Sequence, residues 1–311
     1  MQKRTLGKTN LPVSVLGFGA APVAYLKADQ DRAQMVIEKL LAAGVNLLDT
    51  AASYPGSESF IGERFSDRRH DYVLVSKCGQ KIPEADASPW TEAVITATVD
   101  RALKQLRTTH LDVMLLHSCS LDVLKNGEAL GTLVKAKQSG KTRFIGYSGD
   151  NEAAAYAAGL KDLDVLETSI SIADQINIDT VLPIARTNNV GVLAKRPIAN
   201  AGWKDISQQP GMYQNYAKEY TERLRKMAIT PELVGFKPTS GDESDAWPEM
   251  ALRFTLSIDG IHTAIIGTTN ADNASNNVRY ANAGALDERV IRNLRDAFRK
   301  ADSDGKWSGQ T

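Results

Sequence analysis

The sequence predicts an α/β protein, namely a single (β/α)₈ barrel of the TIM type that spans residues 1–311. Short apolar runs alternate with longer amphipathic runs along the chain, and several of the apolar runs end in an ionisable residue. This rhythm is typical of parallel strands that are each followed by a helix. A doubly wound open sheet has the same alternation, but it usually carries a GxGxxG motif after a strand. The sequence has no such motif, since the nearest candidate, residues 17–20 (GFGA), is too short to match it.

The expected strands are short, rich in β-branched residues and nearly continuous in apolar character, as parallel strands buried on both faces are. They are residues 13–19, 46–50, 72–77, 111–117, 143–148, 164–170, 191–196 and 263–268.

The expected helices lie between the strands and carry apolar residues at helical spacing. They are residues 31–43, 91–107, 122–138, 151–158, 178–188, 246–257, 270–283 and 287–300.

Two segments lie outside this alternation. The N-terminal residues predict a small β-hairpin around Gly7-Lys8-Thr9-Asn10. A long polar insertion of about residues 199–245 follows the seventh strand and contains a further helix, residues 213–227. Loops after barrel strands line the active-site face, so this insertion is either a lid or specificity loop or a surface excursion. Residues 306–309 are a second candidate to close over the site.

Composition excludes several classes of protein. Lys+Arg and Asp+Glu both number 37, and this balance argues against a nucleic-acid-binding protein. The sequence contains no long apolar run and no apolar stretch after the basic N-terminus, so we expect no membrane span, no signal peptide and a cytoplasmic location. At 42% hydrophobic the chain needs no metal or disulfide, and Cys78 and Cys119 are expected to be reduced and buried.

Three consecutive strands end in ionisable residues. Asp49 ends the second, Lys77 the third and His117 the fourth, and Tyr54 follows Asp49 by five residues. In a parallel barrel these ends meet at one cavity. Individually, each residue has an ordinary structural explanation, such as a helix cap, a surface lysine or a core histidine. Together, in this order and spacing, they predict a catalytic site.

The residue types indicate acid–base chemistry. A buried Lys beside a buried Asp stays charged, and its cation is expected to lower the pKa of a nearby tyrosine from about 10 toward neutrality. Such a tyrosine transfers protons near pH 7. A neutral His in the same site can orient a substrate oxygen by a hydrogen bond.

These residues carry a resemblance to a known family. The segment 49–54 (DTAASY) with Gly56 and Glu58, the run 75–77 (VSK), the run 111–117 (LDVMLLH) and the segment 140–148 (GKTRFIGYS) resemble the aldo-keto reductases. The resemblance covers essentially the whole chain. It places that family's catalytic tetrad on Tyr54, Asp49, Lys77 and His117. It implies NAD(P)H-dependent reduction of an aldehyde or ketone to an alcohol, with the proton from Tyr54.

The resemblance also implies where the cofactor binds. The predicted nicotinamide contacts are Ser148, Gly149 and Glu167, where the family usually has Ser-Asn and Gln. Lys195 stands where many members have a stacking aromatic ring, so Lys195 and Arg196 either meet the pyrophosphate or form an ion pair with an acid such as Glu167.

Further along the chain, the predicted phosphate and adenine contacts are Gly267, Thr268, Thr269, Asn273 and Asn277. Asn273 replaces an Arg that binds the 2′-phosphate in NADP-preferring members. NADP(H) is therefore the family expectation, NAD(H) is possible, and Arg279 or Arg196 could substitute for the missing charge.

The substrate expected from the resemblance is a small carbonyl compound, and Trp90 and Trp203 are candidate walls of its pocket. The same residues are compatible with other functions. The chain could be a cofactor-binding redox sensor or regulatory barrel with little turnover. Lys77 could instead form a Schiff base in a lyase, and a Cys119–His117 nucleophile pair is a further alternative. The natural substrate and the oligomeric state are not predicted.

Overall fold

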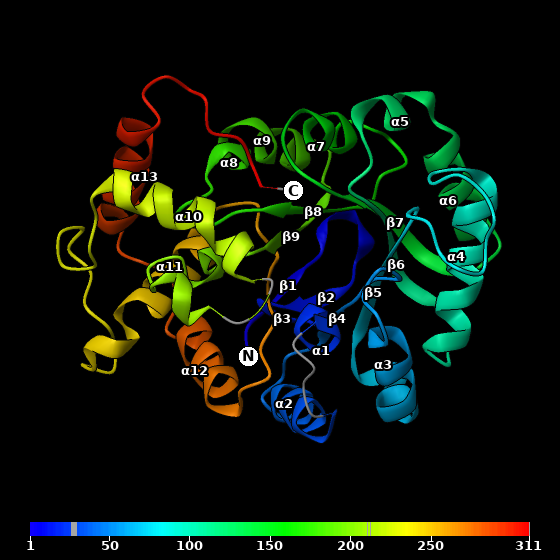
Figure 1. The fold of residues 1–311 in the computed structure, drawn as a ribbon, viewed down its shortest axis with the longest axis horizontal. Coiled ribbons are helices and arrows are strands. Elements are labelled where there is room, and N and C mark those ends of the chain that lie inside the picture. The colour runs from blue at the N-terminus through cyan, green and yellow to red at the C-terminus, as the bar shows by residue number, and fades with distance from the viewer. Residues whose placement is uncertain (26–29, 210, 212, 311) are drawn as a thin grey trace.

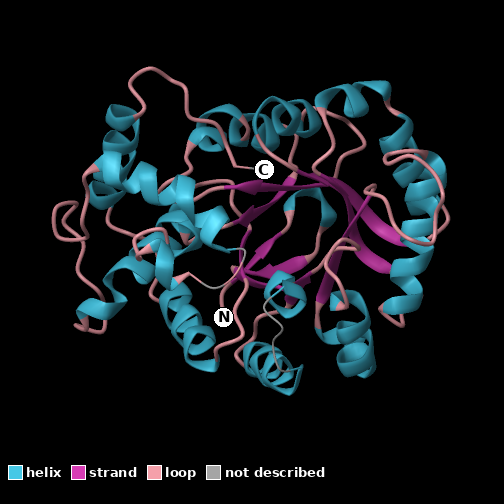
Figure 2. Cartoon of the chain, viewed as in Figure 1, coloured by secondary structure: helices cyan, strands magenta, loops and turns pink. Residues whose placement is uncertain are grey.

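The computed structural model describes residues 1–25, 30–209, 211 and 213–310. Its centre is a closed barrel of parallel strands that helices surround on the outside (Figures 1 and 2). β10 pairs with both β9 and β3, and this pairing closes the barrel. The strands are β3 (Leu16–Gly19), β4 (Leu47–Asp49), β5 (Val73–Cys78), β6 (Leu111–His117), β7 (Thr142–Ser148), β8 (Val165–Ser169), β9 (Gly191–Lys195) and β10 (Thr263–Ile266). The predicted (β/α)₈ barrel is confirmed.

The helices follow the strands as the sequence predicts, with a few differences. They are α1 (Ala21–Tyr25), α2 (Gln30–Ala42), α3 (Ser57–Phe65), α4 (Glu92–Gln105), α5 (Leu121–Asn126), α6 (Glu128–Gln138), α7 (Asn151–Ala158), α8 (Ile176–Thr180), α9 (Leu182–Thr187), α10 (Tyr213–Met227), α11 (Ala246–Ser257), α12 (Ala271–Asn282) and α13 (Glu288–Ala301). Short 3₁₀ segments are η1 (Gly7–Thr9), η2 (Ser66–Asp71), η3 (Ala199–Ala201), η4 (Ile206–Gln208) and η5 (Glu243–Asp245).

Two predicted helices are each divided in the structure. The expected helix 122–138 is α5 and α6, because Gly127 between them adopts a left-handed backbone with φ of 82°. The expected helix 178–188 is α8 and α9, with Pro183 in the first turn of α9, where its missing N–H costs no helical hydrogen bond. α1 and α3 were not among the predicted helices.

The predicted N-terminal hairpin is present. β1 (Lys3–Thr5) pairs antiparallel with β2 (Pro12–Ser14), and η1 forms the connection between them. The expected strand 13–19 is therefore divided, since its first residues belong to the hairpin and the barrel strand begins at Leu16. Leu6, Leu11 and Val13 of the hairpin pack against inward-facing barrel residues.

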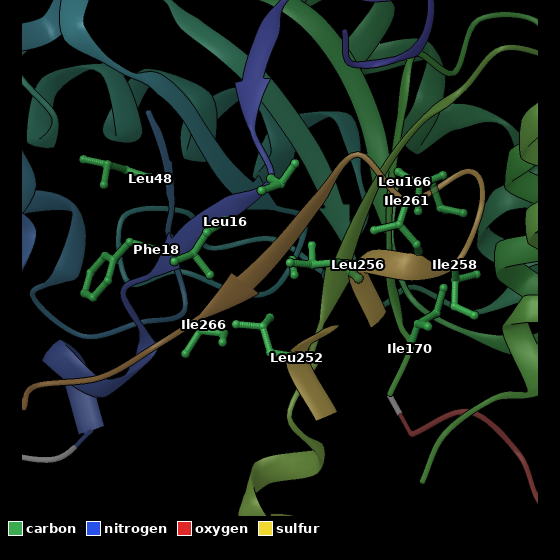
Figure 3. Close-up of a cluster of buried hydrophobic side chains, with 14 of the residues drawn as sticks. Leu16, Phe18, Leu48, Leu166, Ile170, Leu252, Leu256, Ile258, Ile261 and Ile266 are labelled. Carbon is green, nitrogen blue, oxygen red and sulfur yellow. The ribbon is translucent and has the colours of Figure 1, made fainter. Parts of the chain in front are cut away.

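The core has two layers, which the alternation of side chains along each strand separates. Every second strand residue faces the helices, as Leu16, Phe18 and Ile266 do in Figure 3. The residues between them face the barrel axis, among them Val75 and Leu115. The sequence shows no such alternation in polarity, because both layers are apolar except at the carboxyl ends of the strands.

The insertion after β9 contains η3, η4, α10 and η5, and α10 spans the predicted residues 213–227. α10 packs against η3 and α13, at the side of the barrel where β8 and β9 end (Figure 1). No helix in the described part of the chain has the length and apolar character of a membrane span.

Candidate active site

The inward-facing layer at the carboxyl ends of the strands is polar. It contains Asp49 from β4, Lys77 from β5, His117 from β6, Glu167 from β8 and Lys195 from β9. Each follows an inward-facing apolar residue two positions earlier, as Lys77 follows Val75. Because side chains alternate along a strand, this spacing of two directs the five ionisable groups into one space.

Lys77 lies at the centre of this layer. Its ammonium contacts the carboxylate of Asp49, donates to the carbonyl oxygen of Thr50 at 3.1 Å, and lies 3.2 Å from Oε2 of Glu167. Burial opposes the charge of Lys77, but the two carboxylates outweigh it and raise the pKa of the ammonium. Lys77 is therefore a charged group at the floor of the resting site.

Tyr54 lies in the loop between β4 and α3. Its ring centroid is 5.6 Å from the ammonium of Lys77 and 5.9 Å from the ring of His117, which it meets nearly edge-on. The ring of Tyr25 from α1 packs against its other side at 5.7 Å. The predicted four residues are thus neighbours, and Tyr54 lies where the Lys77 and His117 side chains converge.

The expected fall in the pKa of Tyr54 is wrong. Burial is the largest influence on the phenol and raises its pKa, and the carboxylates of Asp49 and Glu167 act in the same direction. The Lys77 cation lowers the pKa but does not outweigh them. Neither the desolvation nor the second carboxylate is evident from the sequence around Tyr54 and Lys77. In the free protein Tyr54 is a neutral phenol, the form that donates a proton.

His117 is neutral, as expected. Burial lowers its pKa to about 3, and the cations of Lys77 and Lys195 contribute. Its Nδ1 lies 3.2 Å from the hydroxyl of Ser53, the residue before Tyr54. This contact joins the β4–α3 loop to the end of β6 and holds the imidazole beside the tyrosine ring.

A cleft of about 770 Å³ lies next to these side chains, at the carboxyl ends of the strands. Asp49, Tyr54 and His117 line its floor. The predicted cofactor contacts that line it are Ser148, Glu167, Lys195, Arg196, Gly267, Thr268, Thr269 and Asn273. The volume is that of a pocket for a cofactor or a drug-sized ligand. Within the described residues, no group of three or more His, Cys, Asp or Glu side chains could hold a metal ion.

Lys195 forms an ion pair, but its partner differs from the one suggested. Its ammonium lies 2.9 Å from Oδ2 of Asp150, which follows β7, and not against Glu167. The carboxyl of Glu167 is already held by Lys77 and by the Ser148 hydroxyl at 3.3 Å. Arg196 donates to the carbonyl oxygen of Gln310 at 2.8 Å.

The loop after β10 closes one end of the cleft. A Cβ on Gly267 would lie 2.6 Å from Pro22 and 2.7 Å from the carbonyl oxygen of Gly19, so a lysine there would not fit without a shift. The side chain of Asn270 caps α12 by accepting from the N–H groups of Asp272 and Asn273. The N–H groups expected to meet a phosphate are thus partly occupied in this structure.

Five predicted residues are not among those that line the cleft, namely the buried Lys77 and four others. Gly149 packs on the ring of Tyr147, and Asn277 is buried in α12. Trp203 stacks on Trp247 with ring centroids 5.7 Å apart. The ring of Trp90 packs over Gly79, and the backbone N–H of Trp90 donates to the carbonyl oxygen of Gly79.

Several site residues were absent from the predictions. Tyr25, Tyr213 and Tyr216 supply the aromatic lining that Trp90 and Trp203 were expected to give. Asp150 is buried, and it binds Lys195, Thr168 and the backbone of Ser169. Asp150 had a sequence signal, since it is an acid just past the end of a predicted strand. Tyr25 follows the end of β3 by six residues, but the sequence gives no other signal for it. Tyr213 and Tyr216 lie on α10, far beyond the end of β9 in sequence.

The sequence model of the Aldo/keto reductase family matches residues 15–298, and the chain belongs to this family. Curated relatives include the L-galactose dehydrogenase of Arabidopsis thaliana, 26% identical over 89% of this chain and 87% of that protein. Another is the NADH-specific methylglyoxal reductase of Escherichia coli, 24% identical over 96% of this chain and 100% of that one. Among solved structures, the holo form of an aldo-keto reductase from Bacillus halodurans matches with a TM-score of 0.77, 24% identity and 96% coverage of both chains.

Proposed function

We propose that this chain is a carbonyl reductase that takes its hydride from NADH or NADPH and its proton from Tyr54. The observation that carries the proposal is the convergence of Tyr54, His117 and the Lys77–Asp49 ion pair on the floor of one cleft. Aldo/keto reductases use nicotinamide cofactors, and a bound nicotinamide would supply the hydride.

The side chains divide the remaining work. The neutral phenol of Tyr54 donates its proton to the substrate oxygen as that oxygen gains negative charge. Neutral His117 donates a hydrogen bond to the same oxygen and orients it. The Lys77 cation stabilises the phenolate that Tyr54 becomes, and Asp49 fixes the ammonium beneath the ring. Arg196 and Lys195, at the edge of the cleft, are proposed to face the cofactor pyrophosphate.

The test is the substitution Tyr54→Phe, which removes the proton donor and keeps the ring. Oxidation of NADH and NADPH with a panel of aldehydes should lose about 10²- to 10⁴-fold in kcat, the usual contribution of a general acid. The matched control is Tyr25→Phe, because Tyr25 packs on Tyr54 and its hydroxyl donates to the Ser53 carbonyl at 2.8 Å. Cofactor binding without Tyr54-dependent turnover would favour the regulatory barrel instead.

We also propose that this chain discriminates only weakly between NADP(H) and NAD(H). Among the described residues of 267–273 that line the cleft, none is a Lys or Arg. Arg279, a possible substitute, is held by Asp245 at 2.7 Å. The family expectation of NADP(H) therefore has no charged 2′-phosphate contact in this part of the site. The similarity to an NADH-specific methylglyoxal reductase agrees with a site that does not require the 2′-phosphate.

A positive charge placed where the 2′-phosphate is expected should create a preference for NADPH over NADH. Asn273→Arg places a guanidinium at the start of α12, where charge-assisted hydrogen bonds to a 2′-phosphate should tighten NADPH relative to NADH about tenfold or more. Titrations read as fluorescence quenching measure the ratio. Asn282→Arg, at the other end of α12, makes the same charge change and should leave the ratio unaltered. Equal gains in both variants would contradict a contact at residue 273.

A further inference from the structure

Two buried carboxyl groups share one buried cation at the floor of the cleft. The side chain of Lys77 is 0% exposed, and those of Asp49 and Glu167 are 5% and 4% exposed. With both carboxyls ionised, the three groups would carry one uncompensated negative charge in a low-dielectric space. Such a charge is costly unless a proton or a further cation offsets it.

The hydrogen bonding of Glu167 points to a proton. Its Oε1 accepts from the Ser148 hydroxyl. Its Oε2 is buried and lies 3.2 Å from the Lys77 ammonium, but it accepts no hydrogen bond within the described structure. The carboxyls of Asp49 and Glu167 lie within hydrogen-bonding contact of each other. Two carboxylates at such a contact repel, whereas a carboxylic acid beside a carboxylate supplies the missing donor.

The other ionisable groups that face Asp49 and Glu167 do not compensate the excess negative charge. From the β4–α3 loop and α1 come Tyr54 and Tyr25, both neutral phenols whose pKa values are raised chiefly by burial. From β6 comes neutral His117. From β9 comes Lys195, whose charge is balanced by Asp150 after β7.

We propose that Asp49 and Glu167 hold one proton between them in the resting site, and that this proton leaves when an oxidised nicotinamide brings positive charge into the cleft. The inference rests on the proposed function, because it needs the cofactor to bind in this cleft. It assigns Glu167, where the family usually has Gln, the role of a proton store next to Lys77.

The pKa values agree with this arrangement. Burial raises the pKa of Asp49 to about 8, and the neighbouring Glu167 adds to the rise, while Lys77 opposes it. Asp49 therefore retains a proton at neutral pH, within hydrogen-bonding contact of Glu167.

The proton balance of carbonyl reduction follows. The carbonyl carbon gains a hydride with its electron pair, and the substrate oxygen takes the proton of Tyr54. Tyr54 recovers a proton from Lys77, and Lys77 recovers one from the Asp49–Glu167 pair, whose charge goes from one negative to two. The pair gains one negative charge as the cofactor ring gains one positive charge, so the net charge of the site is unchanged. Solvent returns the proton when the oxidised cofactor leaves.

The test measures protons at binding, without turnover. Calorimetric titration at pH 7 in buffers of different ionisation enthalpy gives the protons released by NAD⁺, NADH, NADP⁺ and NADPH. The oxidised form of each pair should release about one proton more than the reduced form, by linkage. The 2′-phosphate is common to both forms of NADP and cancels in the difference. In Glu167→Gln, with one carboxyl against one ammonium, the difference should vanish.

Affinity should follow the same linkage. The oxidised form should tighten relative to the reduced form by up to about tenfold per pH unit as the pH rises to about 8, and the ratio should then become constant. Glu249→Gln is the control, because Glu249 is also a buried carboxylate but pairs with Arg253 on α11. It should leave the proton difference as in the wild type.

A measurement on the wild-type protein alone guards against a variant that does not fold. The infrared band of a protonated carboxyl should disappear when NAD⁺ or NADP⁺ is added and persist with NADH or NADPH. Equal proton release by both forms, or a difference that survives in Glu167→Gln, would overturn the inference and leave the proposed function standing. Absence of binding by all four cofactors would overturn both.

Discussion

At the scale of single residues, the electrostatics of the site differ from what pairs of neighbours suggest. Tyr54 has a cation 5.6 Å from its ring, yet its pKa rises because burial and two carboxylates outweigh that cation. His117 lies near the same cation, and there burial and positive charge act in one direction. The site therefore keeps two uncharged proton-transfer groups above a charged Lys77.

The neutral state of His117 should be visible in stability against pH. Its pKa is lowered to about 3 by burial, from about 6.5 in an unfolded chain. The unfolded state therefore binds a proton below pH 6.5 that the folded state refuses. Stability is full above pH 6.5 and falls as the pH decreases toward 3, by up to about 1.4 kcal/mol per pH unit from this group.

His117→Asn isolates this contribution from that of the carboxyl groups. Urea unfolding between pH 7 and 4 should show a steeper loss of stability in the wild type than in the variant. Parallel curves for the two proteins would mean that His117 becomes protonated in the folded state.

At the scale of elements, each strand places its site residue by alternation, and the breaks between helices depend on backbone conformation. Lys77 and His117 lie two residues beyond Val75 and Leu115, which face the barrel axis, so their direction follows from the strand itself. The break between α5 and α6 follows from Gly127, whose φ of 82° few other residues adopt without strain.

Two alanine substitutions in this helical region should have opposite effects. Gly127→Ala forces a Cβ into a left-handed backbone and should lower the free energy of unfolding by about 1 kcal/mol. Gly131→Ala lies within α6 and should raise it by about 0.5–1 kcal/mol through helix propensity. Neither new Cβ meets another atom within 4 Å, so the difference reports the backbone alone. Urea denaturation measures both, and destabilisation by both substitutions would indicate a packing effect.

At the scale of the whole molecule, the C-terminal segment joins elements that are far apart in sequence. Trp307 packs edge-on against Phe298 at 4.9 Å, and the guanidinium of Arg223 lies 5.1 Å from its ring. Gln310 donates its N–H to Asp174 and accepts from Ser169. Residues 306–309 do not line the cleft. The next residue, Gln310, accepts a hydrogen bond from Arg196, and Arg196 lines the cleft. The segment also runs back toward β8 and β9 in Figure 1.

Ending the chain after Gly305 should destabilise the fold. It removes the Trp307 ring and leaves Arg223, only 2% exposed, without its bond to the Ser308 carbonyl. We expect the free energy of unfolding to fall by at least about 2 kcal/mol, from lost aromatic packing and an unsatisfied charged donor. Lys306→Ala, which changes an exposed side chain of the same segment, should cost almost nothing. Equal unfolding midpoints for the truncated and full chains would refute a structural role for the segment.

The sequence alone determined the barrel, the N-terminal hairpin and the position of α10, because alternating strand and helix periods and turn residues are local properties. It also predicted that Asp49, Tyr54, Lys77 and His117 lie together, since parallel strands end at one face.

The tertiary structure decided the sign of the Tyr54 pKa shift, the pairing of Lys195 with Asp150, and the aromatic lining from α1 and α10. These depend on burial and on distances between elements that are not adjacent in sequence. A strand pattern gives the direction of a side chain, but its charge state depends on every group within a few ångströms of it.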